Sequence, residues 1–203
     1  MKIVLKAFLI IFGIGLLFFI IWIIVIISAF GGFDKDYSVT ELKEHYIENK
    51  NELSEIKNFI NSITPLGKNV HIEFDNDKTL GIFHLSTKTE TEIERSNNWD
   101  LEINSTKTDS LLDELGWTKE TLITLKYKLD KAKCISVSNG EPTKIGFQRS
   151  GMGMYSFNLF EKPLPKSEYA TYNDSCTYIL VNNKMVLEYG GGAIGSQCFY
   201  NFK

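Results

Sequence analysis

Several signatures of enzyme chemistry are missing from this chain of 203 residues. It has no Gly-x-Ser-x-Gly turn, no HExxH helix and no paired-cysteine spacing of the kind that binds zinc. The three cysteines and three histidines form no sequence motif for a metal site or for a nucleophile. The sequence therefore predicts no metal site and no cofactor.

Charge is also missing from a long stretch near the N-terminus. No charged residue occurs from Ala7 to Phe33, and residues 7–30 are apolar except for two glycines and a serine. As a helix rising about 1.5 Å per residue, residues 7–30 would reach about 36 Å, more than the hydrocarbon core of about 30 Å. A single transmembrane helix in the lipid bilayer is therefore predicted. The alternative is a cleaved signal peptide, whose apolar core is usually only about 7–15 residues long.

The flanks of the apolar run predict its orientation. Lys2 and Lys6 precede the run without an acidic neighbour, whereas the segment 34–36 that follows it contains two aspartates. By the positive-inside rule, the N-terminus is expected in the cytoplasm. Residues 1–33 would then be a cytoplasmic stub, a membrane anchor and a glycine linker, and residues 34–203 an exported domain.

A basic bias is absent from the part of the chain that follows the anchor. Residues 34–203 contain 20 basic and 25 acidic residues, a net charge of −5. Nucleic-acid binding requires a basic surface that neutralises phosphates, so no nucleic-acid partner is expected. The same charge argues against a second, electrostatic attachment to anionic lipids.

A long amphipathic helix is predicted over residues 39–63. Ser38 and Glu41 have the spacing of a capping box, and Pro65 ends the pattern. Apolar residues recur along one stripe, with Asn49 as its polar member. Two interpretations stay open: a helix that packs across its own sheet, or a short coiled coil that forms a homodimer, with Asn49 fixing the register.

Residues 70–84 read as a β-hairpin with alternating apolar and polar residues around a polar turn. If the apolar faces align, Val70 pairs with His84, and His71 points to the opposite face from His84. This register separates the two histidines, and no metal site is expected on the hairpin.

Helices are predicted again in the middle of the chain. Residues 87–98 are polar and are expected to form a surface loop. Beyond them, Ser105 or Thr108 can cap a short helix that ends at Gly116. Thr118 can cap a second helix, which makes an antiparallel helix pair.

The C-terminal half has a β pattern. Its short connections favour antiparallel pairing, so the fold class is α+β with a largely antiparallel sheet. The expected strands, together with one that precedes the helix pair, cover residues 99–103, 134–138, 143–149, 153–160, 177–182 and 185–189.

Two glycine-rich segments, 146–155 and 190–198, form the candidate binding site. Backbone N–H groups in such segments can converge on an anion, and Arg149 would add a charged partner. Neither segment has the Lys-Ser/Thr ending of a phosphate loop, and tight strand turns need glycine for their own reasons. The residues expected to contribute to ligand binding are Arg149, Ser150, Gly151, Gly153, Tyr155 and Gln197.

Three cysteines outside the cytoplasm would give one disulfide and one free thiol. The expected pair is Cys176 with Cys198, because Cys198 lies in a glycine-rich tail that needs anchoring. Such a staple contributes about 3 kcal/mol. Cys134 is expected to be a buried strand residue.

Taken together, the sequence predicts a single-pass membrane protein whose exported α+β domain binds a ligand or an envelope partner, with no catalysis expected. The first alternative is an envelope hydrolase or transferase that uses the segments 146–155 and 190–198. The second is a membrane-anchored immunity or inhibitor protein, for which the acidic domain would suit a basic partner.

Overall fold

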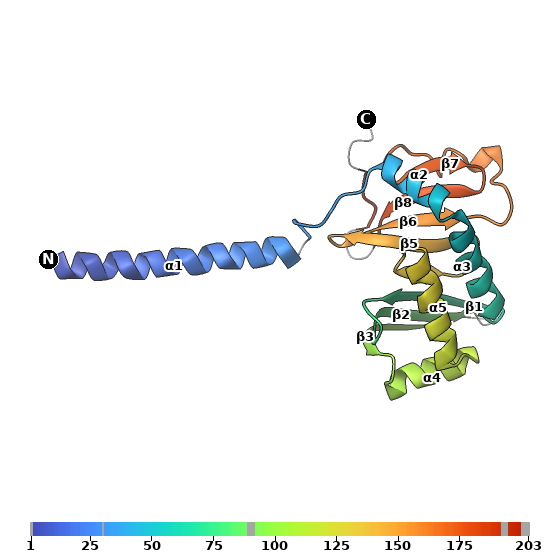
Figure 1. Cartoon of the computed structure of the whole chain (residues 1–203), viewed down its shortest axis with the longest axis horizontal. Helices are drawn as coiled ribbons and strands as arrows, with labels where there is room; N and C mark the ends of the chain where they lie inside the picture. Colours follow the sequence, from blue (N-terminus) through green and yellow to red (C-terminus); the bar gives the residue numbers. More distant parts are fainter. Residues whose placement is uncertain (1, 30, 89–91, 192–194, 200–203) are drawn as a thin grey trace.

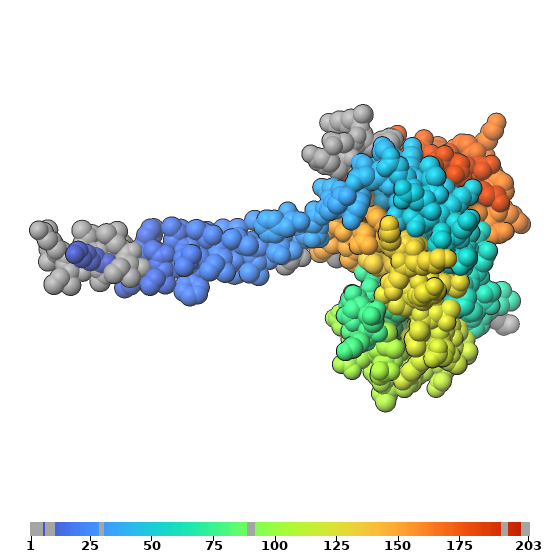
Figure 2. All heavy atoms as spheres, in the orientation of Figure 1, coloured from blue at the N-terminus to red at the C-terminus, as the bar shows by residue number. Residues whose placement is uncertain are grey.

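One long N-terminal helix and one α+β domain make up the structure (Figure 1). The computed structural model describes residues 2–29, 31–88, 92–191 and 195–199. Helix α1 (Lys2–Ala29) extends away from the domain (Figure 2), and none of the segment Ile11–Ser28 is buried by the rest of the chain. By length and composition, α1 suits a membrane anchor, and a signal sequence would have the same features.

The domain is built on one antiparallel sheet, which confirms the predicted fold class. Within the described residues it has eight strands in the order β3-β2-β1-β4-β5-β6-β8-β7. The strands are β1 (Lys68–Phe74), β2 (Thr79–Lys88), β3 (Ile93–Glu102), β4 (Ser136–Ser138), β5 (Thr143–Ser150), β6 (Gly153–Leu159), β7 (Tyr178–Asn182) and β8 (Met185–Gly190). Strands β1 and β4 pair at the centre, which joins the N-terminal three strands to the C-terminal five.

Helices cover one face of this sheet. They are α2 (Val39–Glu48), α3 (Lys50–Ile63) and α5 (Lys119–Lys131); α4 (Thr106–Leu115) lies near β3, and a short 3-10 helix η1 (Lys166–Glu168) precedes β7 (Figure 1). The core lies between these helices and the sheet, because leucines and isoleucines of the helices pack there against branched and aromatic strand residues. Its fully buried members include Leu53, Ile56, Ile60, Leu122, Leu125, Leu129, Ile72, Phe83, Val137, Ile145, Phe157 and Leu187.

The predicted caps of the helix pair are present. Ser105 accepts a hydrogen bond from the backbone N–H of Thr108, and Thr118 forms a capping box with Thr121. Gly116 ends α4 in the left-handed conformation that its lack of a side chain permits.

The prediction of one continuous helix over residues 39–63 is wrong. The capping box of Ser38 and Glu41 is present, but Asn49 interrupts the helix, and α3 follows α2 directly after this one residue (Figure 1). The side-chain amide of Asn49 donates to the His45 carbonyl at 2.9 Å, and this carbonyl also accepts the backbone N–H of Asn49 at 3.0 Å. The apolar stripe on both sides of the break is buried in the domain's own core, whereas Ile47 is 72% exposed.

The polar segment 87–98 is a hairpin rather than the predicted surface loop. Strand β2 continues to Lys88 and β3 begins at Ile93, with the two strands paired antiparallel. Strand β3 is an edge strand with mostly exposed side chains, so burial on one face did not impose the apolar alternation by which strands are recognised.

Candidate functional site

The face of the sheet that the helices leave uncovered carries polar side chains. Along β6, Tyr155 and Phe157 belong to the apolar core, so Ser156 between them points to the opposite face. On β1 and β2, Ile72 and Phe83 face the core in the same way. Because side chains alternate along a strand, the residues between these core positions point to the uncovered face, and several of them are polar.

A cavity of about 440 Å³ opens on this polar face. Strands from both halves of the sheet line it, so its walls depend on the central pairing of β1 with β4. The lining residues are His71, Glu73, Ile82, His84, Trp99, Ser136, Lys144, Arg149, Met154, Ser156, Gly190 and Gly191.

A β-bulge brings the two histidines of the first hairpin together, contrary to the prediction. Phe74 pairs with Leu80 as expected, but Gly81 is an extra residue on β2, and the pairs that follow are shifted by one. His71 therefore lies directly opposite His84, with ring centroids 6.0 Å apart. An added Cβ on Gly81 would lie 2.2 Å from Oδ1 of Asp75, so a larger residue at the bulge would require that side chain to move.

The histidine pair is held in a neutral state at neutral pH. Burial lowers the pKa of His71 to about 4, and the positive charges of the nearby Lys144 and Arg149 act in the same direction. Nδ1 of His71 lies 2.7 Å from Oγ of Ser138, which fixes the ring. Among the described residues, no three His, Cys, Asp or Glu side chains are placed to hold a metal ion.

Each charged side chain that lines the cavity has an oppositely charged partner. The Arg149 guanidinium donates two hydrogen bonds to the Glu73 carboxylate, at 2.5 and 2.7 Å, and the Glu73 side chain is only 5% exposed. Lys144 Nζ donates to Oε1 of Glu188 at 2.6 Å. These pairs leave the cavity wall polar but internally neutralised.

Two polar atoms in the cavity wall have no hydrogen-bond partner among the described residues. They are Oγ of Ser156, in a residue 1% exposed, and Nε2 of His84. Buried polar groups are almost always hydrogen-bonded, so an unpartnered pair in one cavity points to a missing ligand or to ordered water.

Comparisons of the chain with protein families, curated proteins and solved structures find no match.

The residues predicted from the glycine-rich segments divide between the cavity and the helix-covered side. Arg149 lines the cavity. Ser150 Oγ and Tyr155 Oη instead donate to Oδ1 of Asp36, at 2.9 and 3.4 Å, and the Tyr155 side chain is in the core. The structure therefore does not bring Ser150 and Tyr155 to the same site as Arg149.

An anion does bind the first glycine-rich turn, and it comes from the chain itself. The Gly151 N–H donates to Oδ2 of Asp34 at 2.8 Å, in the linker that follows α1. Gly31 packs so closely here that a Cβ on it would lie 1.9 Å from Cα of Gly151. The glycines at this turn thus serve to dock the linker onto the domain.

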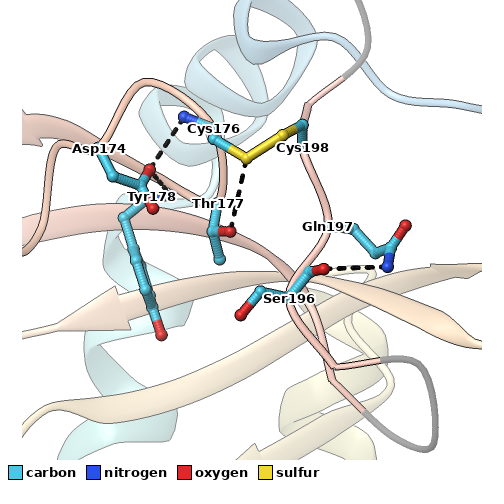
Figure 3. Close-up of a disulfide and its surroundings, with 7 residues drawn as sticks. All are labelled: Asp174, Cys176, Thr177, Tyr178, Ser196, Gln197 and Cys198. Atoms are coloured by element: carbon cyan, nitrogen blue, oxygen red, sulfur yellow. Dashed lines mark hydrogen bonds between the residues drawn. A yellow bond between two sulfur atoms is a disulfide. The ribbon is translucent and has the colours of Figure 1, made fainter.

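The second glycine-rich segment lies beside the first. Met154 of β6 pairs with Gly190, and Gly153 faces the ring of Tyr189. The backbone N–H of Gln197 donates to the Tyr189 carbonyl at 3.2 Å, and the Gln197 side chain donates to the Ser196 carbonyl (Figure 3). Of this segment, Gly190 and Gly191 reach the cavity.

The predicted disulfide between Cys176 and Cys198 is confirmed (Figure 3). It closes a sequence separation of 22 residues and fastens the C-terminal segment to the start of β7. Phe199 next to it is buried against Tyr155 and Tyr189, which fixes the end of β8. Cys134 is buried and free, as expected, although it precedes β4 and does not lie in the strand, and burial raises the pKa of its thiol.

Sequence reasoning missed most of the cavity. It did not assign a binding role to His71, Glu73, His84, Trp99, Lys144 or Ser156. One signal was available in β6, where Ser156 and Asn158 alternate with apolar residues in a strand that is buried throughout. A buried strand with polar residues on one face indicates a polar interior surface.

Proposed function

We propose that this chain is a membrane-anchored, extracytoplasmic binding protein whose uncovered sheet face receives a ligand or an exposed group of an envelope partner. The observation that carries the proposal is the cavity with its two unpartnered polar atoms, Ser156 Oγ and His84 Nε2. A cavity of about 440 Å³ is within the range of ordinary small-molecule sites. No catalysis is part of the proposal.

The membrane location is supported by α1 and by the disulfide. An apolar helix with no buried residues in the segment Ile11–Ser28 gains free energy by entering lipid. Lys2 and Lys6 favour a cytoplasmic N-terminus. The bond between Cys176 and Cys198 would persist in an oxidising compartment outside the cytoplasm.

Binding is favoured over catalysis by the state of the polar groups. Glu73 and Arg149 neutralise each other, and His71, with a pKa of about 4, is a weak base. A general base acts best when its pKa lies near the working pH. The wall is thus better suited to hold a molecule than to transfer a proton.

The three tryptophans allow a direct test on the full chain in lipid nanodiscs. Trp22 lies in α1, Trp99 lines the cavity, and Trp117 is buried elsewhere with its indole N–H donating to the Ile63 carbonyl at 2.8 Å. In 15N NMR spectra, fragments that bind the cavity should shift the indole signal of Trp99 and leave the other two in place. A library without any fragment that moves Trp99 alone would contradict the proposed function.

Orientation is tested separately in intact cells. Ser54 is exposed on α3, so a membrane-impermeant maleimide should label Ser54→Cys and should not label Lys6→Cys. The native Cys134 is buried and gives no background. Labelling of Lys6→Cys alone would show the opposite orientation.

A further inference from the structure

We infer that the cavity binds a neutral carbohydrate, one sugar ring stacked beside Trp99 with its hydroxyl groups on Ser156, His84 and the Glu73–Arg149 pair. This inference rests on the proposed function and adds the chemical class of the ligand. It follows from three properties of the cavity wall: its charge balance, its exposed aromatic ring and the kind of polar atoms left unpartnered.

The charge balance selects against a charged ligand. Each ionised side chain in the wall already has an opposite partner, Glu73 with Arg149 and Lys144 with Glu188. Burial lowers the pKa values of His71 and His84, so both rings are neutral at pH 7. A charged ligand would have to leave water without gaining an unpaired counter-charge, which is costly.

The aromatic ring gives the cavity an apolar surface beside its polar groups. Trp99 is 58% exposed although its indole lines the cavity, and the His84 ring meets it edge to face at 5.0 Å. Ile82 and Met154 add apolar surface. A sugar ring presents C–H groups on one face and hydroxyl groups around its edge, which matches a tryptophan ring bordered by hydrogen-bonding groups.

The unpartnered atoms match hydroxyl groups in their chemistry. A serine hydroxyl both donates and accepts, and a neutral histidine nitrogen does either, depending on its tautomer. A sugar hydroxyl has the same dual capacity. The Glu73–Arg149 pair places acceptors and donors side by side, so adjacent hydroxyl groups can bind both at once.

The test uses sugars that share a ring and differ in charge, added to the full chain in phosphatidylcholine nanodiscs without glycoside detergents. The neutral probes are methyl glucoside and N-acetylglucosamine, and the charged ones are glucuronate and glucosamine. We expect the neutral sugars to shift the Trp99 indole signal and to bind about tenfold more tightly than the charged ones. For the variants, sugar binding is measured by saturation-transfer NMR, which observes the signals of the sugar.

Two variants probe the stacking surface and the hydroxyl contact. Trp99→Ala and Ser156→Ala should each weaken neutral sugar binding, Trp99→Ala by about tenfold, with Trp99→Phe retaining part of it. The matched control is Tyr127→Ala, which removes another exposed aromatic side chain, on α5 and outside this cavity. Equal loss in Tyr127→Ala would contradict stacking in the cavity.

The possible outcomes separate the two proposals. Tighter binding of glucuronate or glucosamine than of the neutral sugars would overturn the neutral-ligand inference. The fragment library also contains a short neutral peptide, acetylated trialanine amide. If this peptide or another fragment shifts the Trp99 indole signal and no sugar does, the carbohydrate inference is wrong and the binding function stands. If neither sugars nor fragments shift Trp99, both proposals are wrong.

Discussion

Replacing Ser156 by alanine should stabilise the folded domain while weakening its ligand binding. Ser156 is 1% exposed, and its Oγ has no hydrogen-bond partner among the described residues. The unfolded chain hydrates this hydroxyl, whereas no group of the described residues pairs with it after folding. That desolvation costs about 1–3 kcal/mol, and Ser156→Ala removes the cost together with only one buried oxygen atom. We expect a net gain of about 1 kcal/mol in the free energy of unfolding.

Thr143 provides the matched control, because it is a buried hydroxyl residue with partners. Its Oγ1 donates to the Gly140 carbonyl at 2.9 Å and accepts from Nδ2 of Asn61 at 2.7 Å. Thr143→Val keeps the shape and removes both bonds, which should cost about 1–3 kcal/mol. The two variants thus remove the same kind of atom and should change stability in opposite directions.

Thermal unfolding of the full chain, followed by near-ultraviolet circular dichroism, measures both effects. For a domain of this size, 1 kcal/mol shifts the midpoint by about 2–4 °C. Ser156→Ala should melt above the parent protein and Thr143→Val below it. A destabilised Ser156→Ala, comparable to Thr143→Val, would refute the reasoning that this hydroxyl is kept for a ligand at a cost to stability.

Three further predictions concern the disulfide, the histidine pair and the buried ion pair. Cys176→Ser should lower the free energy of unfolding by about 3 kcal/mol, because a loop of 22 residues is no longer closed in the unfolded chain. A reductant should lower the urea midpoint of the parent protein and leave that of the variant unchanged. Equal midpoints of the parent and the variant without reductant would contradict this prediction. The pKa of His71 is about 4 in the folded domain and 6.5 in the unfolded chain, so the unfolded chain takes up the proton first as the pH falls. The free energy of unfolding should therefore be unaffected by His71 above about pH 6.5 and should fall by up to about 3 kcal/mol between pH 6.5 and pH 4. His71→Asn should show a shallower acid dependence in urea titrations, and an unchanged profile would exclude His71 as the source. Arg149→Met should lower the free energy of unfolding by about 3 kcal/mol, because it leaves the Glu73 carboxylate unpaired. The double variant Glu73→Leu/Arg149→Met should have a higher urea midpoint than Arg149→Met alone. A lower midpoint in the double variant would contradict a penalty from the unpaired charge.

Local signals in the sequence predicted the elements of the fold, and long-range geometry decided the site. Capping residues such as Ser38 and Thr118, and the αL glycine Gly116, act within one turn of their helices, so their positions could be read directly. Strand β3 could not be recognised in full, because an exposed edge strand has no buried face to impose a pattern.

The cavity depended on features that no local pattern encodes. One extra residue, Gly81, shifts the register of a hairpin and places His71 opposite His84. The pairings of β1 with β4 and of β4 with β5 then bring Glu73 to Arg149, which is 76 residues away in the chain. A shift of one residue in the pairing of a strand moves its side chains to the opposite face of the sheet. A site whose residues come from several strands therefore forms only if the register of each strand pair is correct.

Under the proposed membrane location, the docked linker would limit how far the cavity can lie from the lipid surface. Only residues 30–33 separate the end of α1 from Asp34, which is bound to the Gly151 turn. Even a fully extended chain from Ala29 to Asp34 spans at most about 18 Å. With α1 in the bilayer, the end of the sheet that holds Arg149 stays within about two nanometres of the lipid surface. The protein would therefore sample only molecules in the layer next to its own membrane, and a target fixed in that membrane would be met by lateral diffusion.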